Sequence, residues 1–252
     1  MFNYKGKVEA YIRDIINQGK GVFMGLIDPC KYCKEKTYKI AEFLKKGGAD
    51  IILIGGSIGA EGEDLSAVAK KIKENLDIPL NIFPGNVGNL TKYTDSVYFM
   101  SLLNSSNPYW ITQAPALGTY TIKKYNIEPL PTAYLVFEPG QTVGWVGEAK
   151  LIPINKPDIA LSYALAAQYF GMRFIILESG SGAPSPIPTE IVSAIRKNTD
   201  LIIVIAGGVK TPQQAHKLIK AGANCIHIGT KLENGNNILN KIKAFGEAIH
   251  SV

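Results

Sequence analysis

Short, continuous apolar runs alternate along the chain with segments in which apolar residues recur every three or four positions. Runs such as residues 51–54, 175–177 and 201–205 contain only apolar side chains, which is typical of strands buried on both faces of a parallel sheet. Segments such as residues 8–18 carry apolar residues at helical spacing. The alternation predicts one α/β domain built on a parallel sheet.

The order of these segments predicts the architecture. We expect strands over residues 21–27, 51–54, 80–83, 96–100, 132–137, 174–177, 201–205 and 225–228. We expect helices over residues 8–18, 38–46, 64–75, 157–170, 189–197, 212–221 and 238–249, with a partly helical stretch at 109–121. Eight strands in 252 residues match a single (β/α)8 TIM barrel spanning residues 1–252, with room for one irregular or replaced helix. Residues 138–156 read as a long irregular loop, which is typical of a lid or a binding loop.

Small and polar residues follow most of the predicted strands. In a barrel the carboxyl ends of all strands meet at one rim, and phosphate commonly binds after strands seven and eight. Glycines there let backbone N–H groups approach an anion closely. The predicted rim residues are Asp28, Ser57, Asn86, Asn104, Glu138, Glu178, Ser179, Gly180, Ser181, Gly182, Gly207, Gly208, Gly229 and Thr230.

Two carboxylates stand out at this rim. Asp28 suits Mg²⁺, which binds through one or two carboxylates together with substrate phosphates. The structural alternative for Asp28 is a turn residue before Pro29. Glu178 directly follows an apolar strand, where a charge is costly unless it faces a site. The structural alternative for Glu178 is a solvated loop residue. No predicted rim position holds a histidine, which argues against a Ser-His-Asp site.

Composition narrows the class of function. The net charge of +6 comes without a dense Lys/Arg block, so the sequence does not favour nucleic acid as a partner. Cys30 and Cys33 form a C-x-x-C with no second pair, and the low cysteine count favours a reducing cytoplasm. No secretory signal or transmembrane stretch is predicted. Most of the aromatic and apolar residues between strands three and five read as core, with a deep hydrocarbon groove as the less favoured interpretation. These residues are Phe99, Met100, Leu102, Leu103, Tyr109, Trp110, Tyr120 and Tyr134.

Seven motifs in order resemble those of geranylgeranylglyceryl phosphate synthase and its bacterial relatives of the PcrB type. They are Leu26-Ile27-Asp28-Pro29, Gly55-Gly56-Ser57, Phe83-Pro84-Gly85, Glu138-Pro139-Gly140-Gln141-Thr142-Val143-Gly144, Leu177-Glu178-Ser179-Gly180-Ser181-Gly182-Ala183, Ala206-Gly207-Gly208-Val209 and Ile228-Gly229-Thr230-Lys231-Leu232-Glu233. The resemblance covers nearly the whole chain. The pattern is similar to the archaeal-type branch, whose members form oligomers larger than a dimer.

The resemblance implies a prenyltransferase of phospholipid biosynthesis. It would join geranylgeranyl diphosphate to the 3-hydroxyl of sn-glycerol 1-phosphate with Mg²⁺ as cofactor, in a homo-oligomer that contacts membranes transiently. By position, Asp28 and Ser57 would hold Mg²⁺. The glycerol phosphate would lie against Ile176, Leu177, Glu178, Ser179, Gly180, Ser181, Gly182, Gly207, Gly208, Gly229 and Thr230, with Glu178 as the catalytic base.

Two positions depart from the family pattern. Relatives often carry tyrosine where this chain has Ile176, and a second acid where it has Cys30. Two other classes of function stay open. One is another phosphate-binding barrel enzyme, such as a sugar-phosphate isomerase or an aldolase-like lyase, although no predicted strand carries the lysine that a Schiff-base aldolase needs. The other is a non-catalytic binder of a phosphorylated lipid.

Overall fold

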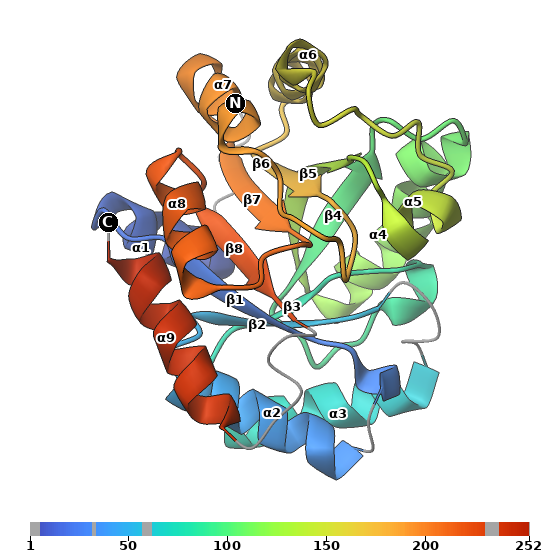
Figure 1. Cartoon of the computed structure of the whole chain (residues 1–252). Helices are drawn as coiled ribbons and strands as arrows, with labels where there is room; N and C mark the ends of the chain where they lie inside the picture. The colour runs from blue at the N-terminus through green and yellow to red at the C-terminus, as the bar shows by residue number, and fades with distance from the viewer. Residues whose placement is uncertain (1–5, 32–33, 57–61, 230–236, 252) are drawn as a thin grey trace.

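The eight predicted strands form one closed parallel barrel. A computed structural model describes residues 6–31, 34–56, 62–229 and 237–251 of the chain. Each strand pairs with the next, and the last pairs with the first (Figure 1). The strands are β1 (Val22–Ile27), β2 (Ile51–Ile54), β3 (Leu80–Ile82), β4 (Ser96–Leu102), β5 (Glu128–Val136), β6 (Phe174–Glu178), β7 (Ile202–Ala206) and β8 (Cys225–Ile228). The (β/α)8 prediction is confirmed.

Helices surround the strands. They are α1 (Lys7–Asn17), α2 (Lys34–Lys46), α3 (Gly62–Asn75), α4 (Ala114–Tyr125), α5 (Gln141–Val146), α6 (Pro157–Tyr169), α7 (Thr189–Asn198), α8 (Pro212–Lys220) and α9 (Ile238–His250). A π-helical turn, Tyr109–Gln113, leads into α4. The partly helical stretch expected there is therefore continuous helix through Tyr125. None of the helices in the described part of the chain is long and apolar enough to cross a bilayer.

Side chains alternate between two buried layers along each strand, because successive residues of a strand point to opposite faces. One layer lies between the strands and the helices and includes Ile52, Leu135 and Ile203. The other fills the inside of the barrel and includes Leu53, Val136 and Val204. Both faces are apolar, which explains why the strand segments lack an alternating polar pattern.

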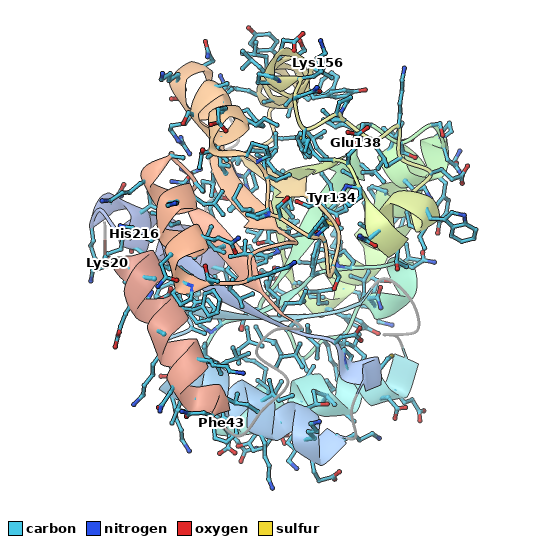
Figure 2. All side chains as sticks on the ribbon, in the orientation of Figure 1. Lys20, Phe43, Tyr134, Glu138, Lys156 and His216 are labelled. Atoms are coloured by element: carbon cyan, nitrogen blue, oxygen red, sulfur yellow. The ribbon has the colours of Figure 1, made fainter. Side chains whose placement is uncertain are left out.

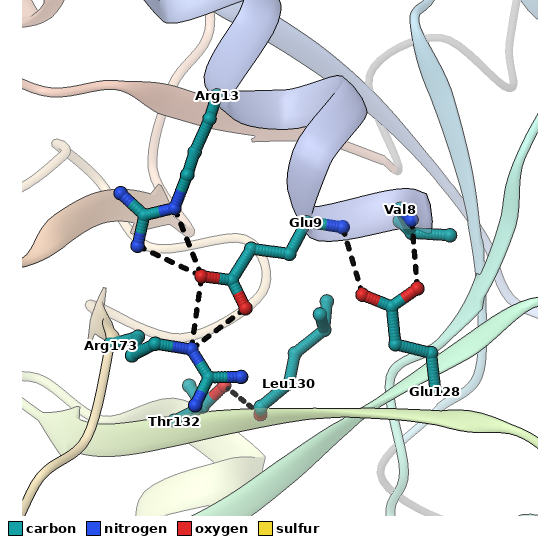
Figure 3. Close-up of polar contacts among 7 residues, drawn as sticks. All are labelled: Val8, Glu9, Arg13, Glu128, Leu130, Thr132 and Arg173. Carbon is teal, nitrogen blue, oxygen red and sulfur yellow. Dashed lines mark hydrogen bonds and ion pairs between the residues drawn. The ribbon is translucent and has the colours of Figure 1, made fainter. Parts of the chain in front are cut away.

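Helix α1 packs across the amino ends of the strands. Its apolar face, with Val8, Ile12 and Ile15, belongs to the layer inside the barrel. The Glu128 carboxylate at the start of β5 accepts hydrogen bonds from the backbone N–H groups of Val8 at 2.7 Å and Glu9 at 2.9 Å (Figure 3). These acceptors satisfy two of the N–H groups that every helix leaves unpaired at its start. The carboxyl ends of the strands, at the opposite rim, hold the candidate site.

One helix of the usual barrel ring is replaced. Between β3 and β4 the chain makes only a 3-10 turn, Val87–Asn89, where a regular barrel would place an α-helix. A capping box closes this turn: the Asn86 side chain accepts from the N–H of Val87 at 2.8 Å, and Asn89 accepts from the N–H of Asn86. The sequence-based expectation of one irregular or replaced helix therefore corresponds to this position.

Three expectations about secondary structure are wrong. Helix α2 begins at Lys34, four residues before the predicted start. Strand β5 begins at Glu128, four residues before the predicted start. Residues 138–156 are not structureless, because they contain α5 and two isolated bridges, Ser105 with Ala149 and Phe137 with Ile152. Asn104 helps to hold this segment in place, since its amide donates to the carbonyl of Val136 at 2.8 Å and to that of Lys150 at 2.9 Å.

Candidate active site

A cavity of about 400 Å³ opens at the carboxyl rim of the barrel. Its polar part is lined by Asp28, Gly56, Asn86, Glu178, Ser181 and Gly229. Its apolar part is lined mainly by residues of β4, α4 and α5. The cavity therefore brings together the ends of strands that are far apart in the sequence. Asp28 after β1 and Glu178 at the end of β6 lie on the same cavity, as the barrel prediction required.

Asp28 occupies the polar end of the cavity, on the side of β1 and β2. Its Oδ1 accepts a hydrogen bond from the N–H of Cys30 at 3.1 Å, so Asp28 is both a turn residue and a cavity residue. Gly56, after β2, lies so close that a Cβ there would stand 2.8 Å from Oδ1. A side chain at position 56 would therefore displace this carboxylate.

Glu178 is buried, with 6 % of its surface exposed. Its Oε1 accepts the N–H of Gly180 at 2.6 Å, and its Oε2 accepts the hydroxyl of Tyr134 at 3.3 Å. Burial raises the pKa of Glu178 from 4.5 to about 7, although both hydrogen bonds lower it. The alternative interpretation of Glu178 as a solvated loop residue is wrong. A carboxyl with this pKa can exchange a proton near neutral pH.

The loops after β6 and β7 supply backbone and hydroxyl groups beside Glu178. A Cβ at Gly207, whose φ is +77°, would come within 2.8 Å of the backbone nitrogen of Gly180, so only glycine allows the two loops to touch. In the described residues, no group accepts the N–H of Gly207 or Gly208. The hydroxyl of Ser179 is buried, and it has no hydrogen-bond partner among those residues. Groups of this kind suit a phosphate or hydroxyl ligand.

The apolar part of the cavity crosses from the inside of the barrel to the outer layer. Tyr98 and Met100 of β4 face inward, whereas Val97 and Phe99 face the helices, and all four line the cavity. On the outer side the lining continues with Leu90, Gly118 and Ile122. The chain can leave this space open because only a 3-10 turn follows β3. Phe99, Met100, Leu102, Trp110 and Tyr134 all line the cavity, and two of them, Leu102 and Tyr134, are also buried in the core as composition favoured.

Other predicted site residues lie elsewhere. The side chain of Ile176 is buried inside the barrel, and that of Leu177 is buried in the outer layer. Gly207 and Gly208 lie next to the Glu178 loop and outside the described lining of the cavity. Ser57 and Thr230 lie outside the described residues, as does Cys33. Glu138 is exposed.

His227 of β8 is buried against Tyr98 and is not at the rim. The residue is 4 % exposed, and its Nε2 lies 2.9 Å from the hydroxyl of Tyr98. Burial lowers the pKa of His227 to about 3, so the ring stays neutral. No group of three or more His, Cys, Asp or Glu side chains with metal-site geometry occurs in the described residues. A metal at this rim would therefore depend on Asp28 together with ligand oxygens.

Sequence reasoning missed the proximity of Tyr134 to Glu178. Tyr134 was grouped with core aromatics, yet it lines the cavity and donates to the catalytic candidate. Its position on β5 pairs with Ile176 on β6, two residues before Glu178. The signal for this contact was the barrel order itself, since β5 and β6 are neighbours and residues 134, 176 and 178 share the inward parity.

Comparisons with known proteins give a consistent match. The sequence profile of the PcrB family matches residues 14–249. The chain is 49% identical over 233 residues to a geranylgeranylglyceryl phosphate synthase from Thermococcus gammatolerans, covering 92% of each chain. It is 45% identical over 246 residues to a protein of the same name from Methanothermobacter thermautotrophicus, covering 98% of this chain and 100% of the relative.

Solved structures match as well. The (S)-3-O-geranylgeranylglyceryl phosphate synthase of Thermoplasma acidophilum, in complex with its substrate sn-glycerol-1-phosphate, superposes with a TM-score of 0.93 and 36% identity, covering 98% of this chain and 100% of that one. Tryptophan synthase of Mycobacterium tuberculosis superposes with a TM-score of 0.64 at 12% identity, which indicates a shared barrel fold alone.

Proposed function

Because this chain belongs to the PcrB family, we propose that it transfers a geranylgeranyl group from its diphosphate to the 3-hydroxyl of sn-glycerol 1-phosphate. The products are an ether-linked glyceryl phosphate and diphosphate. The observation that carries this function in the structure is one cavity that joins an apolar groove to a buried carboxylate, to Ser181 after β6 and to Gly229 after β8. The substrate of a sugar-phosphate isomerase has no hydrocarbon tail that would fill such a groove.

The apolar part of the cavity binds the hydrocarbon tail. Residues of β4, α4 and α5 surround it, and no lysine or arginine is among its described lining residues. Each buried CH₂ group contributes about 0.8 kcal/mol, so a long tail contributes much of the donor's affinity. The diphosphate end of the donor then lies toward the rim, near Asp28.

The loops after β6, β7 and β8 bind the glycerol phosphate. The N–H groups of Gly207 and Gly208 donate to the phosphate, and the hydroxyl of Ser179 takes a ligand oxygen as its partner. Gly229 belongs to the same rim and lines the cavity. These contacts orient the acceptor, and orientation of two reactants supplies a large share of the rate.

Glu178 removes the proton from the acceptor. The oxygen of the glycerol 3-hydroxyl bonds to C1 of the allylic chain, the bond between C1 and the diphosphate oxygen breaks, and the hydroxyl proton passes to the Glu178 carboxylate. The electron pair of the broken bond leaves with diphosphate. A pKa of about 7 leaves a substantial fraction of Glu178 ionised at neutral pH, as a base requires.

The site suits Mg²⁺ as cofactor. Asp28 is a cavity-lining carboxylate, and Mg²⁺ prefers one or two carboxylates together with substrate phosphate oxygens. Asp28 would hold the ion, with Ser57 as a second candidate by family resemblance. When bound, the ion supplies charge neutralisation for the leaving diphosphate. Assembly into a homo-oligomer and transient membrane contact stay predictions from the same resemblance.

The function is tested by incubating the chain with radiolabelled sn-glycerol 1-phosphate and a ladder of prenyl diphosphates of different lengths. We expect a labelled, organic-extractable ether with the geranylgeranyl donor, and its loss when EDTA removes divalent cations. Mg²⁺ added in excess over EDTA should restore the product. Tight binding of both ligands with no ether formed would instead identify a non-catalytic binder of phosphorylated lipids.

A further inference from the structure

Tyr134 lies where the apolar groove meets the reactive carboxylate. It is 6 % exposed and lines the cavity, and its ring packs edge to face against Phe83 with centroids 5.8 Å apart. Its hydroxyl lies 3.3 Å from Oε2 of Glu178. Figure 2 labels Tyr134 among the strands, with Glu138 above it in the view.

Strand pairing fixes the phenol in this place. Tyr134 on β5 is the register partner of Ile176 on β6, and Glu178 follows on the same side two residues later. Ile176 is apolar and donates nothing to its neighbour. Among the described residues, Tyr134 supplies the one side-chain hydrogen bond to Glu178, and the N–H of Gly180 supplies the one backbone hydrogen bond.

Two donors on two different oxygens hold the carboxylate in one plane. Oε1 accepts from Gly180 at 2.6 Å and Oε2 from Tyr134 at 3.3 Å. Each carboxylate oxygen has two lone pairs, so each keeps one lone pair for a further donor. The carboxylate is thus fixed in orientation while it remains able to accept a substrate proton.

The phenol is a donor throughout the range in which Glu178 titrates. Burial, and then the charge of Glu178, raises the pKa of Tyr134 well above its ordinary value, so the hydroxyl keeps its proton. A hydroxyl that donates to a carboxylate favours the ionised form of that carboxylate. Tyr134 therefore opposes the effect of burial on Glu178 and keeps more of the base in its active form.

We propose that Tyr134 is a positioning residue for proton removal from the glycerol 3-hydroxyl, acting through its hydrogen bond to Oε2 of Glu178. The proposal rests on the proposed function. It assigns to β5 the orientation of Oε2, whereas the N–H of Gly180 in the loop after β6 holds Oε1. The hydroxyl of Tyr134 aims the base, and its ring forms the wall between the base and the groove.

The test is Tyr134→Phe, assayed as kcat and KM against pH. We expect kcat to fall about tenfold, the scale of one lost hydrogen bond to a charged group, with less than a twofold change in KM for sn-glycerol 1-phosphate. The midpoint of the acid limb of the kcat profile should move upward by about one pH unit, because Glu178 loses a donor. An unchanged kcat and an unmoved midpoint would overturn the proposal.

Tyr98→Phe is the matched control. Tyr98 is a buried inward tyrosine of the neighbouring strand, but its hydroxyl lies against His227 at 2.9 Å and Met24 at 3.1 Å instead of Glu178. Whatever this variant does to the rate, it should leave the midpoint of the acid limb in place. A shift equal to that of Tyr134→Phe would mean that any lost phenol in this core moves the titration, and would overturn the assignment to Tyr134.

A double-mutant cycle separates positioning from packing. In a Glu178→Gln background, Tyr134→Phe should change kcat less than twofold, since the base through which it acts is gone. An equal loss in both backgrounds would show that Tyr134 acts elsewhere. If Glu178→Gln alone keeps full activity, the assignment of the base in the proposed function fails instead, and the two failures are distinguishable.

A second substitution covers the case in which Tyr134→Phe does not fold, as judged by its thermal unfolding curve. Incorporation of 3-fluorotyrosine at position 134 keeps the volume and makes the hydroxyl a stronger donor. It should move the midpoint of the acid limb downward, opposite to the phenylalanine variant. A midpoint that stays in place would contradict a hydrogen bond from residue 134 to the base.

Discussion

Glu178 combines two properties that usually exclude each other. It is buried inside an apolar barrel, and it stays close enough to ionisation for proton transfer because Gly180 and Tyr134 both donate to it. Such a group destabilises the folded chain whenever it is charged, and this cost accompanies the pKa near 7 that the proposed role as a base needs.

Glu178→Gln should make the chain more stable at pH 8 than the parent chain. Below pH 4.5 the carboxyl is neutral in both the folded and the unfolded state, so it costs nothing. Between pH 4.5 and about 7 the unfolded state ionises first, and the parent loses about 3 kcal/mol of unfolding free energy relative to the variant. Urea unfolding from pH 4 to 8 measures the difference. A constant difference across that range would contradict the raised pKa.

The sequence located Glu178 and Asp28 because each lies at the carboxyl end of an apolar run. It could not reveal the burial of Glu178 or its contact with Tyr134. Both depend on which strand faces point inward and on the β5–β6 register, and a one-residue slip would have turned Tyr134 outward. The roles of Ser57 and Thr230 stay predictions.

At the scale of elements, two prolines explain why the predicted strand starts four residues later than β5 does. Pro129 and Pro131 lie in the first half of β5, and proline is uncommon within strands because it cannot donate to a ladder. The carbonyl of Pro131 accepts from the N–H of Arg173, so both prolines turn their nitrogens toward β6. Strand β6 begins only opposite Thr132, and no ladder bond is required from either proline.

The 3-10 turn that replaces a helix after β3 gives the groove its outer half. Gly118 of α4 lies on this wall, and a Cβ there would stand 3.5 Å from Leu90, which is ordinary contact. The sequence shows that these side chains are apolar. Whether they fill the core or line a cavity depends on the helix that is replaced after β3. The spacing of apolar residues along the chain does not show that a helix is absent there.

Gly118→Leu should shift the preference of the enzyme toward shorter allylic donors. The added side chain occupies the outer half of the groove, so kcat/KM with the geranylgeranyl donor should fall at least tenfold relative to a shorter allylic donor. Gly118→Ala is the control, since its Cβ fits without displacing Leu90, and it should keep the parent preference. Equal use of long and short donors by the leucine variant would place the tail elsewhere.

At the scale of the molecule, α1 ties the start of the chain to the barrel. Glu9 is fully buried and pairs with Arg13 at 2.8 Å and with Arg173, just before β6, at 2.7 Å (Figure 3). A buried carboxylate that loses a partner is left with an uncompensated charge, so this cluster links residues 164 positions apart.

Arg173→Met should therefore lower the free energy of unfolding by about 3 kcal/mol, measured by urea denaturation. The control is Lys70→Met, which removes the exposed ion pair with Glu74, whose charged atoms lie 3.7 Å apart. This variant should change the free energy of unfolding by less than about 1 kcal/mol. Similar small effects from both variants would show that Arg13 alone suffices for Glu9.

The barrel could be predicted from the sequence because each predicted strand is apolar on both faces, and most are separated by segments whose apolar residues have helical spacing. Closure of β8 onto β1 had no local signature, and it rested on the count of eight strands and on chain length.

Helix α1 covers the amino end of the barrel, and the cavity opens at the opposite, carboxyl rim. The tail of the lipid product would lie in the apolar groove, and it has to leave this groove for water before the next donor binds. We therefore expect release of the apolar product into water to limit turnover. A bilayer or detergent micelle that accepts the product at the rim should raise kcat.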